Sequence, residues 1–236
     1  CARIEDVVGE VGVESVQGEM QHKLDVISNE LILRCLGSRD NVGVLASEEN
    51  ETPFFLRKRA EGGKYAVLFD PLDGSSNIDV SVGVGTIFSV LNLPDGGTRE
   101  EAILQEGSRQ VAAGYVLYGS STMLVLTTGN GVDMFVLDQT IGSFVLVEAN
   151  LQIPTGNNMY SINEAYTAKF SDGVRAYLDW AHQNDYSSRY IGSMVADVHR
   201  TLLKGGVFLY PPTSDKLDGK LRLMYEANPM GMIIEQ

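Results

Sequence analysis

The sequence predicts a mixed α/β fold of the layered α+β kind, in which two sandwiched subdomains each combine a mixed sheet with helices. A helix and two buried strands come first, a run of strands fills the middle of the chain, and a mixture of helices and strands returns after it. The polar stretch 150–158 contains proline and glycine, so we expect the subdomains to be residues 1–150 and 151–236. Regular βα alternation is absent, and no Gly-x-Gly-x-x-Gly string follows a strand, which argues against a dinucleotide-binding fold.

The first part begins with an amphipathic helical pattern over residues 22–36, and its apolar stripe is expected to face the core. This stripe consists of Leu24, Ile27, Leu31 and Cys35, so Cys35 is interpreted as a small core residue. Two short apolar runs follow, at 42–46 and 65–69, and both read as buried strands. The first run leads directly into Ser47-Glu48-Glu49, and the second ends at Asp70.

The middle of the chain reads as an antiparallel meander. Gly129-Asn130-Gly131 is a tight hairpin signal between two apolar runs. The predicted strands are 86–91, 111–117, 123–128, 132–137 and 143–148.

The second part is predicted to contain a helix over 174–182 and another that Ser193 caps and Gly205-Gly206 ends. Residues 207–210 and 221–226 read as strands. Asn228-Pro229 is a suitable N-cap and N1 pair for a last helix.

Both ends of the sequence suggest missing chain. Apolar residues near Cys1 have helical spacing without a cap, and the apolar run after Pro229 stops after about two turns. We therefore expect a fragment that lacks an N-terminal helix and a C-terminal end.

The charge balance limits the partners. With a formal net charge of −13 the protein has no basic stripe for nucleic acid, and no apolar run is long enough to span a membrane. We expect a soluble protein of the cytoplasm or the plastid stroma. A phosphorylated substrate would be repelled unless some carboxylates hold divalent cations, which reverse the local field. The two cysteines form no CxxC motif, so zinc and a disulfide framework are not indicated.

The segment 69–79, Phe-Asp-Pro-Leu-Asp-Gly-Ser-Ser-Asn-Ile-Asp, concentrates the chemistry. A strand delivers Asp70 to its end, and Asp73 follows three residues later, so two hard oxygen ligands suited to Mg²⁺ or Mn²⁺ converge. Gly74-Ser75-Ser76 is read as a turn that opens a helix and offers N–H groups to an anion. The simpler alternative, in which both aspartates only cap the turn, is the usual fate of an isolated Asp-x-x-Asp.

The longer string resembles the motif of the class I fructose-1,6-bisphosphatase family, which is similar to inositol monophosphatases in fold and metal chemistry. Further matches in the same order extend the resemblance over essentially the whole chain. They are Lys23 to Asn29, Ser47-Glu48-Glu49, Tyr160 to Tyr166, Arg189 to Arg200 and Gly219 to Glu226.

The resemblance implies a site of two or three Mg²⁺ ions, with Mn²⁺ as an alternative. The implied metal ligands are Glu48, Asp70, Asp73, Glu226, the main-chain carbonyl of Leu72 and Glu19 in the family's mobile loop. Asp25 and Glu49 resemble the pair that orients and deprotonates the attacking water.

Substrate contacts follow from the same resemblance. Positions that match the sugar and 1-phosphate contacts are Gly74, Ser75, Ser76 and Met194, and those that match the 6-phosphate and sugar contacts are Asn163, Tyr166, Tyr190, Tyr210 and Lys220. Arg189 matches a residue that reaches into the site of a neighbouring subunit, so a homo-oligomer, tetramer or dimer, is expected.

The implied reaction is Mg²⁺-dependent hydrolysis of the 1-phosphate of fructose 1,6-bisphosphate to fructose 6-phosphate and phosphate. A sedoheptulose-1,7-bisphosphatase or a dual-specificity form is the alternative, because one extra sugar carbon is hard for a pocket to reject. A catalytically inactive regulatory relative ranks lower, since all the implied carboxylates are present.

Overall fold

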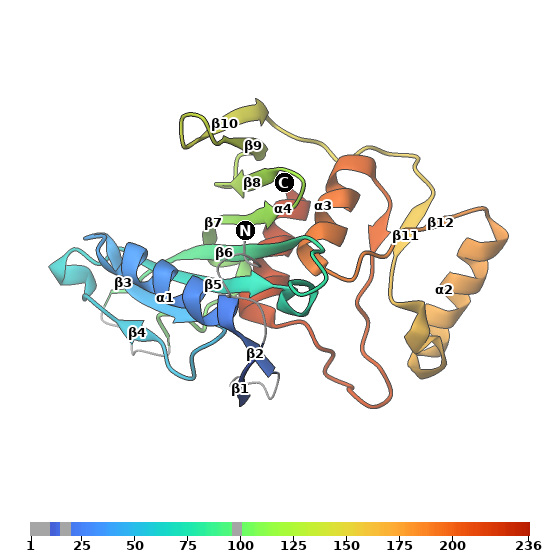
Figure 1. Cartoon of the computed structure of the whole chain (residues 1–236), viewed down its shortest axis with the longest axis horizontal. Helices are drawn as coiled ribbons and strands as arrows, with labels where there is room; N and C mark the ends of the chain where they lie inside the picture. The colour runs from blue at the N-terminus through green and yellow to red at the C-terminus, as the bar shows by residue number, and fades with distance from the viewer. Residues whose placement is uncertain (1–9, 15–19, 96–100) are drawn as a thin grey trace.

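The computed structural model of the chain describes residues 10–14, 20–95 and 101–236 (Figure 1). An eight-stranded sheet in the order β10-β9-β8-β7-β6-β5-β3-β4 dominates the fold, and only the β3–β5 pair is parallel. Its strands are β3 (Val42–Ser47), β4 (Phe54–Phe55), β5 (Tyr65–Asp73), β6 (Val84–Asn92), β7 (Gln110–Tyr118), β8 (Thr122–Thr127), β9 (Val132–Asp138) and β10 (Ser143–Glu148).

A smaller parallel sheet lies beside the large one, in the order β12-β11-β13. Its strands are β11 (Met159–Ser161), β12 (Ser187–Ser188) and β13 (Val207–Phe208), and a separate pair is formed by β1 (Glu10–Glu14) and β2 (Met20–His22). The helices are α1 (Lys23–Gly37), α2 (Asp172–Gln183), α3 (Met194–Lys204) and α4 (Asn228–Glu235), with short turns η1 (Arg59–Glu61), η2 (Ser75–Asn77), η3 (Gly107–Arg109), η4 (Glu164–Lys169) and η5 (Leu223–Ala227).

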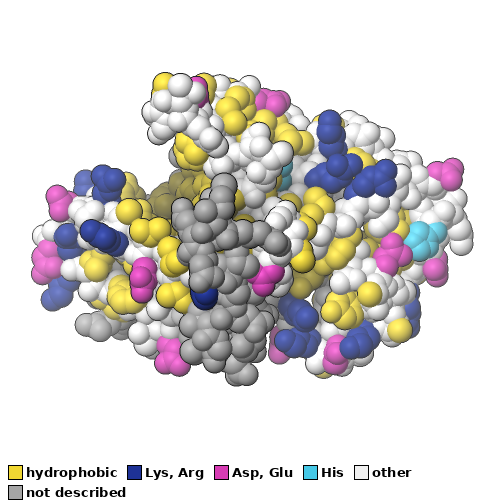
Figure 2. Space-filling view, in the orientation of Figure 1, with side chains coloured by type: hydrophobic (Ala, Val, Ile, Leu, Met, Phe, Trp, Pro, Cys, Tyr) yellow, Lys and Arg dark blue, Asp and Glu magenta, His cyan; other side chains and the backbone are white. Residues whose placement is uncertain are grey.

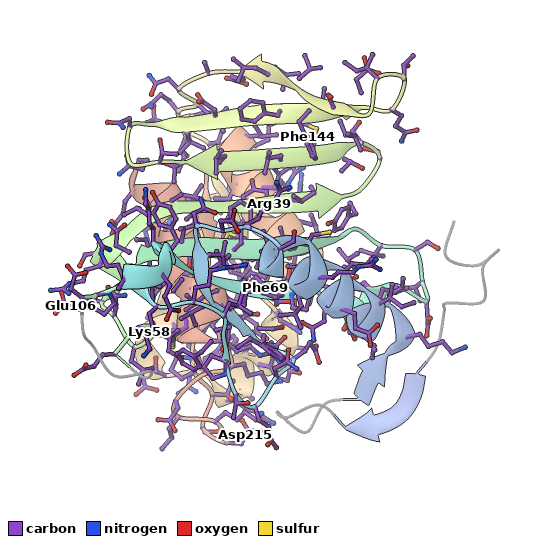
Figure 3. All side chains as sticks on the ribbon, turned by 90° about the vertical axis from the view of Figure 1, so that its left-hand side faces the viewer. Arg39, Lys58, Phe69, Glu106, Phe144 and Asp215 are labelled. Atoms are coloured by element: carbon purple, nitrogen blue, oxygen red, sulfur yellow. The ribbon has the colours of Figure 1, made fainter. Side chains whose placement is uncertain are left out.

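Both faces of the large sheet are covered, and β3 is buried along its whole length because α1 packs on one side of it and Ala102, Ile103 and the η5 residues Met224 and Tyr225 pack on the other. On one face α1 packs over Leu45, Val67 and Phe69, as Figure 3 shows around the label of Phe69. On the other face α3 and α4 pack against a cluster that includes Ile87 and Tyr115. Alternate residues of a strand point to opposite faces, so a strand buried on both sides needs an unbroken apolar run.

The helix α3 lies between the two sheets, and α2 packs on the outer side of the smaller one (Figure 1). The predicted layered α+β fold is confirmed, and the predicted helices over 22–36 and 174–182 and the strands of the meander are present within a few residues. The subdomain boundary near residue 150 stays a prediction. None of the described helices combines the length and apolar character needed to cross a membrane.

The predicted orientation of the first helix is wrong. Leu31 and Cys35 are exposed, and Ile27 is partly exposed, whereas Asp25 and Asn29 are buried. The apolar contacts of α1 come instead from Ile32, Leu33 and Leu36 on its C-terminal half. Asp25 faces inward because it lines the polar cavity described below, and Asn29 faces inward because its amide donates a hydrogen bond to Asn50 Oδ1.

The C-terminal part also differs from prediction. Residues 221–226 form no strand: they lead into a π-helical turn, η5, that continues directly into α4. Asn228 therefore lies inside a helical stretch and is not an N-cap. The strand predicted over 207–210 is reduced to β13.

The strand β10 lies at the edge of the large sheet, and all six of its residues are exposed. Its four apolar side chains, Phe144 to Val147, belong to the lobe at the top of Figure 2, where hydrophobic side chains gather.

Candidate active site

A polar cavity of about 470 Å³ opens where β5, α1, α3 and the turn before α4 meet. Among the described residues, seven acidic side chains line it against two basic ones, Lys220 and Arg222. The acidic residues are Asp25, Glu48, Glu49, Asp70, Asp73, Asp197 and Glu226. An anionic ligand could enter such a cavity only with a cation.

Three carboxylates form the most compact group in the cavity. Asp70, Asp73 and Glu226 are 3%, 7% and 4% exposed, and each offers an oxygen within 4.8 Å of the others. A register shift in the β5–β6 pairing lies between Asp70 and Asp73, and it lets both side chains of one strand point into the cavity. The main chain around them is fixed, because the Leu72 N–H donates to Asp70 Oδ1 at 2.9 Å and Thr86 Oγ1 donates to the Pro71 carbonyl at 2.9 Å.

The charges of this group are poorly compensated. Burial raises the pKa of Asp70 well above its ordinary value, and the negative charges of Asp73, Glu48 and Glu226 raise it further. Burial likewise raises the pKa of Asp73 to about 7, with Glu226 and Asp197 adding to the effect. A divalent cation would remove this penalty, so the donor set and its chemistry fit Mg²⁺ or Mn²⁺.

Glu48 and Arg222 adjoin the three carboxylates. The Arg222 Nε lies 2.7 Å from Glu48 Oε1, and its Nη1 lies 3.4 Å from Glu226 Oε1. The main-chain N–H of Arg222 also donates to Glu226 Oε2. Glu48 is therefore close to the trio, but its nearest charged partner is the guanidinium.

Asp25 and Glu49 reach the same cavity from two different elements. Asp25 lies in the first turn of α1, and Glu49 follows the end of β3. Asn29 Nδ2 of α1 donates to Asn50 Oδ1 at 3.0 Å and links the helix to the segment after β3, and the Glu48 N–H donates to the Phe69 carbonyl of β5 at 3.0 Å.

Gly74, Ser75 and Ser76 also line the cavity, but they do not open a long helix as predicted. They lead into a single 3₁₀ turn, η2, and Gly74 adopts a left-handed conformation with φ of 76°. A side chain there would also lie 3.1 Å from Ser193 Oγ.

The helix α3 has the predicted N-cap residue, but another side chain supplies the capping hydrogen bond. Ser193 is its N-cap residue but makes no side-chain capping bond. Asp73 Oδ2 accepts the N–H of Val195 at 2.9 Å instead, so a carboxylate from β5 caps the helix across 122 residues of sequence.

The predicted sugar-phosphate residues gather on the other part of the site. Tyr190, Met194, Tyr210 and Lys220 line the main cavity, and the last two extend into an adjoining pocket of about 190 Å³. Asn163 and Tyr166 line that second pocket. The Lys220 Nζ lies 5.6 Å from the Tyr166 ring centre. Burial and the negative charge of Asp197 raise the pKa of Tyr190, while a hydrogen bond with Asn163 lowers it in part.

One predicted residue lies away from this cavity, and another cannot be compared with it. Arg189 is exposed and lies with Arg200 beside a separate small pocket, where its Nη1 donates to the Ser188 carbonyl at 2.7 Å. Glu19 lies outside the residues that the structure describes.

Sequence reasoning missed two charged residues of the cavity, Asp197 and Arg222. Each had a signal: Asp197 is a carboxylate within the apolar helical pattern of α3, and Arg222 precedes Glu226 by one helical repeat of four residues. Charged residues in such places are buried only when they have a partner.

Comparisons with known proteins agree with this geometry. The family model described as "Fructose-1-6-bisphosphatase, N-terminal domain" matches residues 1–149, and that described as "Fructose-1-6-bisphosphatase, C-terminal domain" matches residues 153–236. The chain belongs to the fructose-1,6-bisphosphatase family.

Individual members of the family are close. The chain is 50% identical over 244 residues to the fructose-1,6-bisphosphatase class 1 of Chlorobium luteolum, which covers 100% of this chain and 73% of that protein. The crystal structure of Leishmania major fructose-1,6-bisphosphatase in its holo form superposes with a TM-score of 0.94 at 45% identity, over 100% of this chain and 75% of that one. The apo form of the same enzyme superposes with a TM-score of 0.86 at 47% identity, over 91% of this chain and 72% of that one. As a fructose-1,6-bisphosphatase family member, this chain is a phosphatase.

Proposed function

We propose that the chain hydrolyses the 1-phosphate of fructose 1,6-bisphosphate, with Mg²⁺ as the cofactor and fructose 6-phosphate and phosphate as products. One observation carries the proposal: a buried trio of carboxylates opens onto the same cavity as a cluster of tyrosines and a lysine. The trio suits a cation, and the cluster suits a second phosphate held at a distance from it.

Asp70, Asp73 and Glu226 would hold the cation, with Glu48 and the main-chain carbonyl of Leu72 as further oxygens. When bound, Mg²⁺ lowers the pKa of water and neutralises charge that develops on phosphate oxygens. Manganese has the same ligand preference and is the alternative ion. The Arg222 guanidinium contacts Glu48 Oε1 at 2.7 Å, so Glu48 Oε2 is the oxygen that would bind the cation if this contact is kept.

Asp25 and Glu49 would orient the attacking water and take its proton. Both line the cavity, and neither belongs to the compact trio, so they can face a water molecule that is bound beside the cation. A carboxylate is a sufficient base for this step because the pKa of the water is already lowered.

The rest of the substrate would lie along the tyrosines. Gly74, Ser75 and Ser76 would donate N–H and hydroxyl groups to the 1-phosphate, and Met194 would contact the sugar. Tyr190, Tyr210 and Lys220, with Asn163 and Tyr166 in the adjoining pocket, would bind the 6-phosphate. The exposed Arg189 would serve a neighbouring copy, so we also propose a homo-oligomer, tetramer or dimer.

The test is phosphate release from fructose 1,6-bisphosphate and sedoheptulose 1,7-bisphosphate side by side, with Mg²⁺ and with a chelator. We expect release from the fructose substrate, and none with the chelator. In Glu49→Gln, turnover should fall by at least about a hundredfold because the general base is lost, while substrate binding is kept. Glu51→Gln is the matched control, since the same change two residues away falls on an exposed side chain.

Three results would contradict the proposal. Faster turnover of the sedoheptulose substrate would assign the chain to the alternative activity. Binding without any phosphate release would favour an inactive regulatory relative. Equal turnover in the Glu49 and Glu51 variants would remove the water-activating role from Glu49.

A further inference from the structure

Asp197 is the buried carboxylate of the cavity that lies outside the acidic trio and is not accounted for by the steps above. It is 1% exposed in the first turn of α3, and its three hydrogen bonds leave the helix. Oδ1 accepts from Ser161 Oγ at 2.7 Å and from the Ile191 N–H at 2.9 Å, and Oδ2 accepts from the Gly192 N–H at 3.0 Å. Among the residues that the structure describes, no lysine or arginine forms an ion pair with it.

These bonds join two segments that carry the proposed sugar-phosphate contacts. Ser161 ends β11 and stands two residues before Asn163, the N-cap of η4. Ile191 and Gly192 directly follow Tyr190, so the carboxylate fixes the main chain beside that tyrosine. Tyr190 also forms a side-chain hydrogen bond with Asn163, so the two segments contact each other directly.

The same carboxylate is linked to the acidic part of the cavity. The Gly192 carbonyl accepts from Asn77 Nδ2 at 2.9 Å, and Asn77 belongs to η2, the turn that follows Asp73 and Gly74. Gly192 has φ of 88°, a backbone conformation that residues with a side chain rarely adopt. The position of this carbonyl therefore depends on a glycine at residue 192. Asp197 therefore stands between the two halves of the cavity and is bonded toward both.

We propose that Asp197 is a positioning residue that sets the span between the carboxylate trio and the tyrosine cluster, and thereby selects bisphosphates by length. This inference rests on the proposed function. A buried carboxylate that accepts three hydrogen bonds holds its donors in one arrangement, because each donor would otherwise be left without a partner. The distance between the phosphate at the trio and the phosphate at the tyrosines is then fixed.

The test is Asp197→Asn, which keeps the shape of the side chain but turns one acceptor oxygen into a donor NH₂ group. At least one of the three donors loses its partner, and the loop after Tyr190 loosens. We expect KM for fructose 1,6-bisphosphate to rise about tenfold, as for one lost hydrogen bond to a charged group, while kcat changes little. Preference for the fructose over the sedoheptulose bisphosphate, as a ratio of kcat/KM, should fall toward one.

Asp179→Asn is the matched control, because it makes the same chemical change on an exposed residue of α2. If Asp197→Asn does not fold, Ser161→Ala and Asn77→Ala each remove a single bond of the same network. Both should raise KM and lower the preference by smaller factors. Unchanged KM and preference in the folded variants would overturn the inference, and so would a fall in kcat at constant KM.

A binding measurement separates the inference from the proposed function. Fructose 6-phosphate, titrated calorimetrically with no metal present, probes the tyrosine cluster without any hydrolysis. We expect its Kd to rise in Asp197→Asn but not in Asp179→Asn, whether or not the wild-type chain releases phosphate. Equal Kd values in all three proteins would refute the positioning role even if the chain is an active bisphosphatase.

Discussion

Replacing Asp73 by Asn should stabilise the protein in the absence of metal, although it removes a proposed metal ligand. Burial raises the pKa of Asp73 from 3.8 to about 7, so the folded protein favours the protonated form and is penalised when the group ionises. Asparagine is neutral at every pH. Its side-chain oxygen can still accept the Val195 N–H that Asp73 Oδ2 accepts at 2.9 Å, so the cap of α3 can be kept.

The size of the effect follows from the two pKa values. Asp73 has its ordinary pKa of about 4 in the unfolded chain and a pKa of about 7 in the folded protein. Ionisation of Asp73 therefore costs no stability below about pH 4, and the cost grows as pH rises from there to about 7. Each pH unit corresponds to about 1.4 kcal/mol, so the wild-type protein carries a penalty of about 4 kcal/mol at pH 8 and about 2 kcal/mol at pH 5. Asp73→Asn should recover most of this difference, and more of it at pH 8.

Urea unfolding of both proteins at pH 8 and pH 5, with a chelator present, measures the difference. Asp179→Asn provides the control for removal of a negative charge from an exposed site. Addition of Mg²⁺ at pH 8 should make the wild-type protein more stable than Asp73→Asn, because only the wild-type protein keeps the complete carboxylate trio. The reasoning is refuted if the variant is no more stable than the wild-type protein at pH 8 in chelator, or if its advantage grows at pH 5.

Two further variants test the packing behind the site. Gly85→Ala would place its Cβ 2.8 Å from Val195 Cγ1, so we expect a loss of about 1–3 kcal/mol in urea unfolding, whereas Gly83→Ala, whose nearest neighbour would lie 3.6 Å away, should be tolerated. Tyr115→Phe removes the hydroxyl that lies 2.8 Å from His199 Nδ1 and leaves a partly buried nitrogen without this partner, which should cost about 1 kcal/mol by the same measurement.

The large sheet could be predicted from sequence because its strands carry their own signals. Residues 65–69 form a continuous apolar run, and Gly129-Asn130-Gly131 marks the hairpin between β8 and β9. The convergence of Asp70 and Asp73 was predicted from their spacing of three residues, but its cause differs from the predicted one: β5 continues through Asp73, and a register shift within the strand turns both side chains into the cavity. Local pattern is sufficient where neighbours in space are neighbours in sequence.

Prediction failed where distant segments supply the environment. The apolar stripe of α1 predicted burial of Leu31 and Cys35, but the helix packs on the sheet through Ile32, Leu33 and Leu36, and its first turn places Asp25 in the cavity. The π-helical turn that carries Glu226 into the cavity has no local signature and was read as a strand. Asp197 and Arg222 had weak local signals, but their distant partners Ser161 and Glu48 are identified only once the chain is folded.

The two oxygens of the Asp73 carboxylate have different roles. The oxygen of Asp73 that holds Val195 secures the start of α3, which carries Met194 and Asp197 toward the sugar end of the cavity, and the other oxygen remains for an ion. Binding of the cation and binding of the sugar therefore both depend on the position of Asp73. We expect each to increase the affinity for the other.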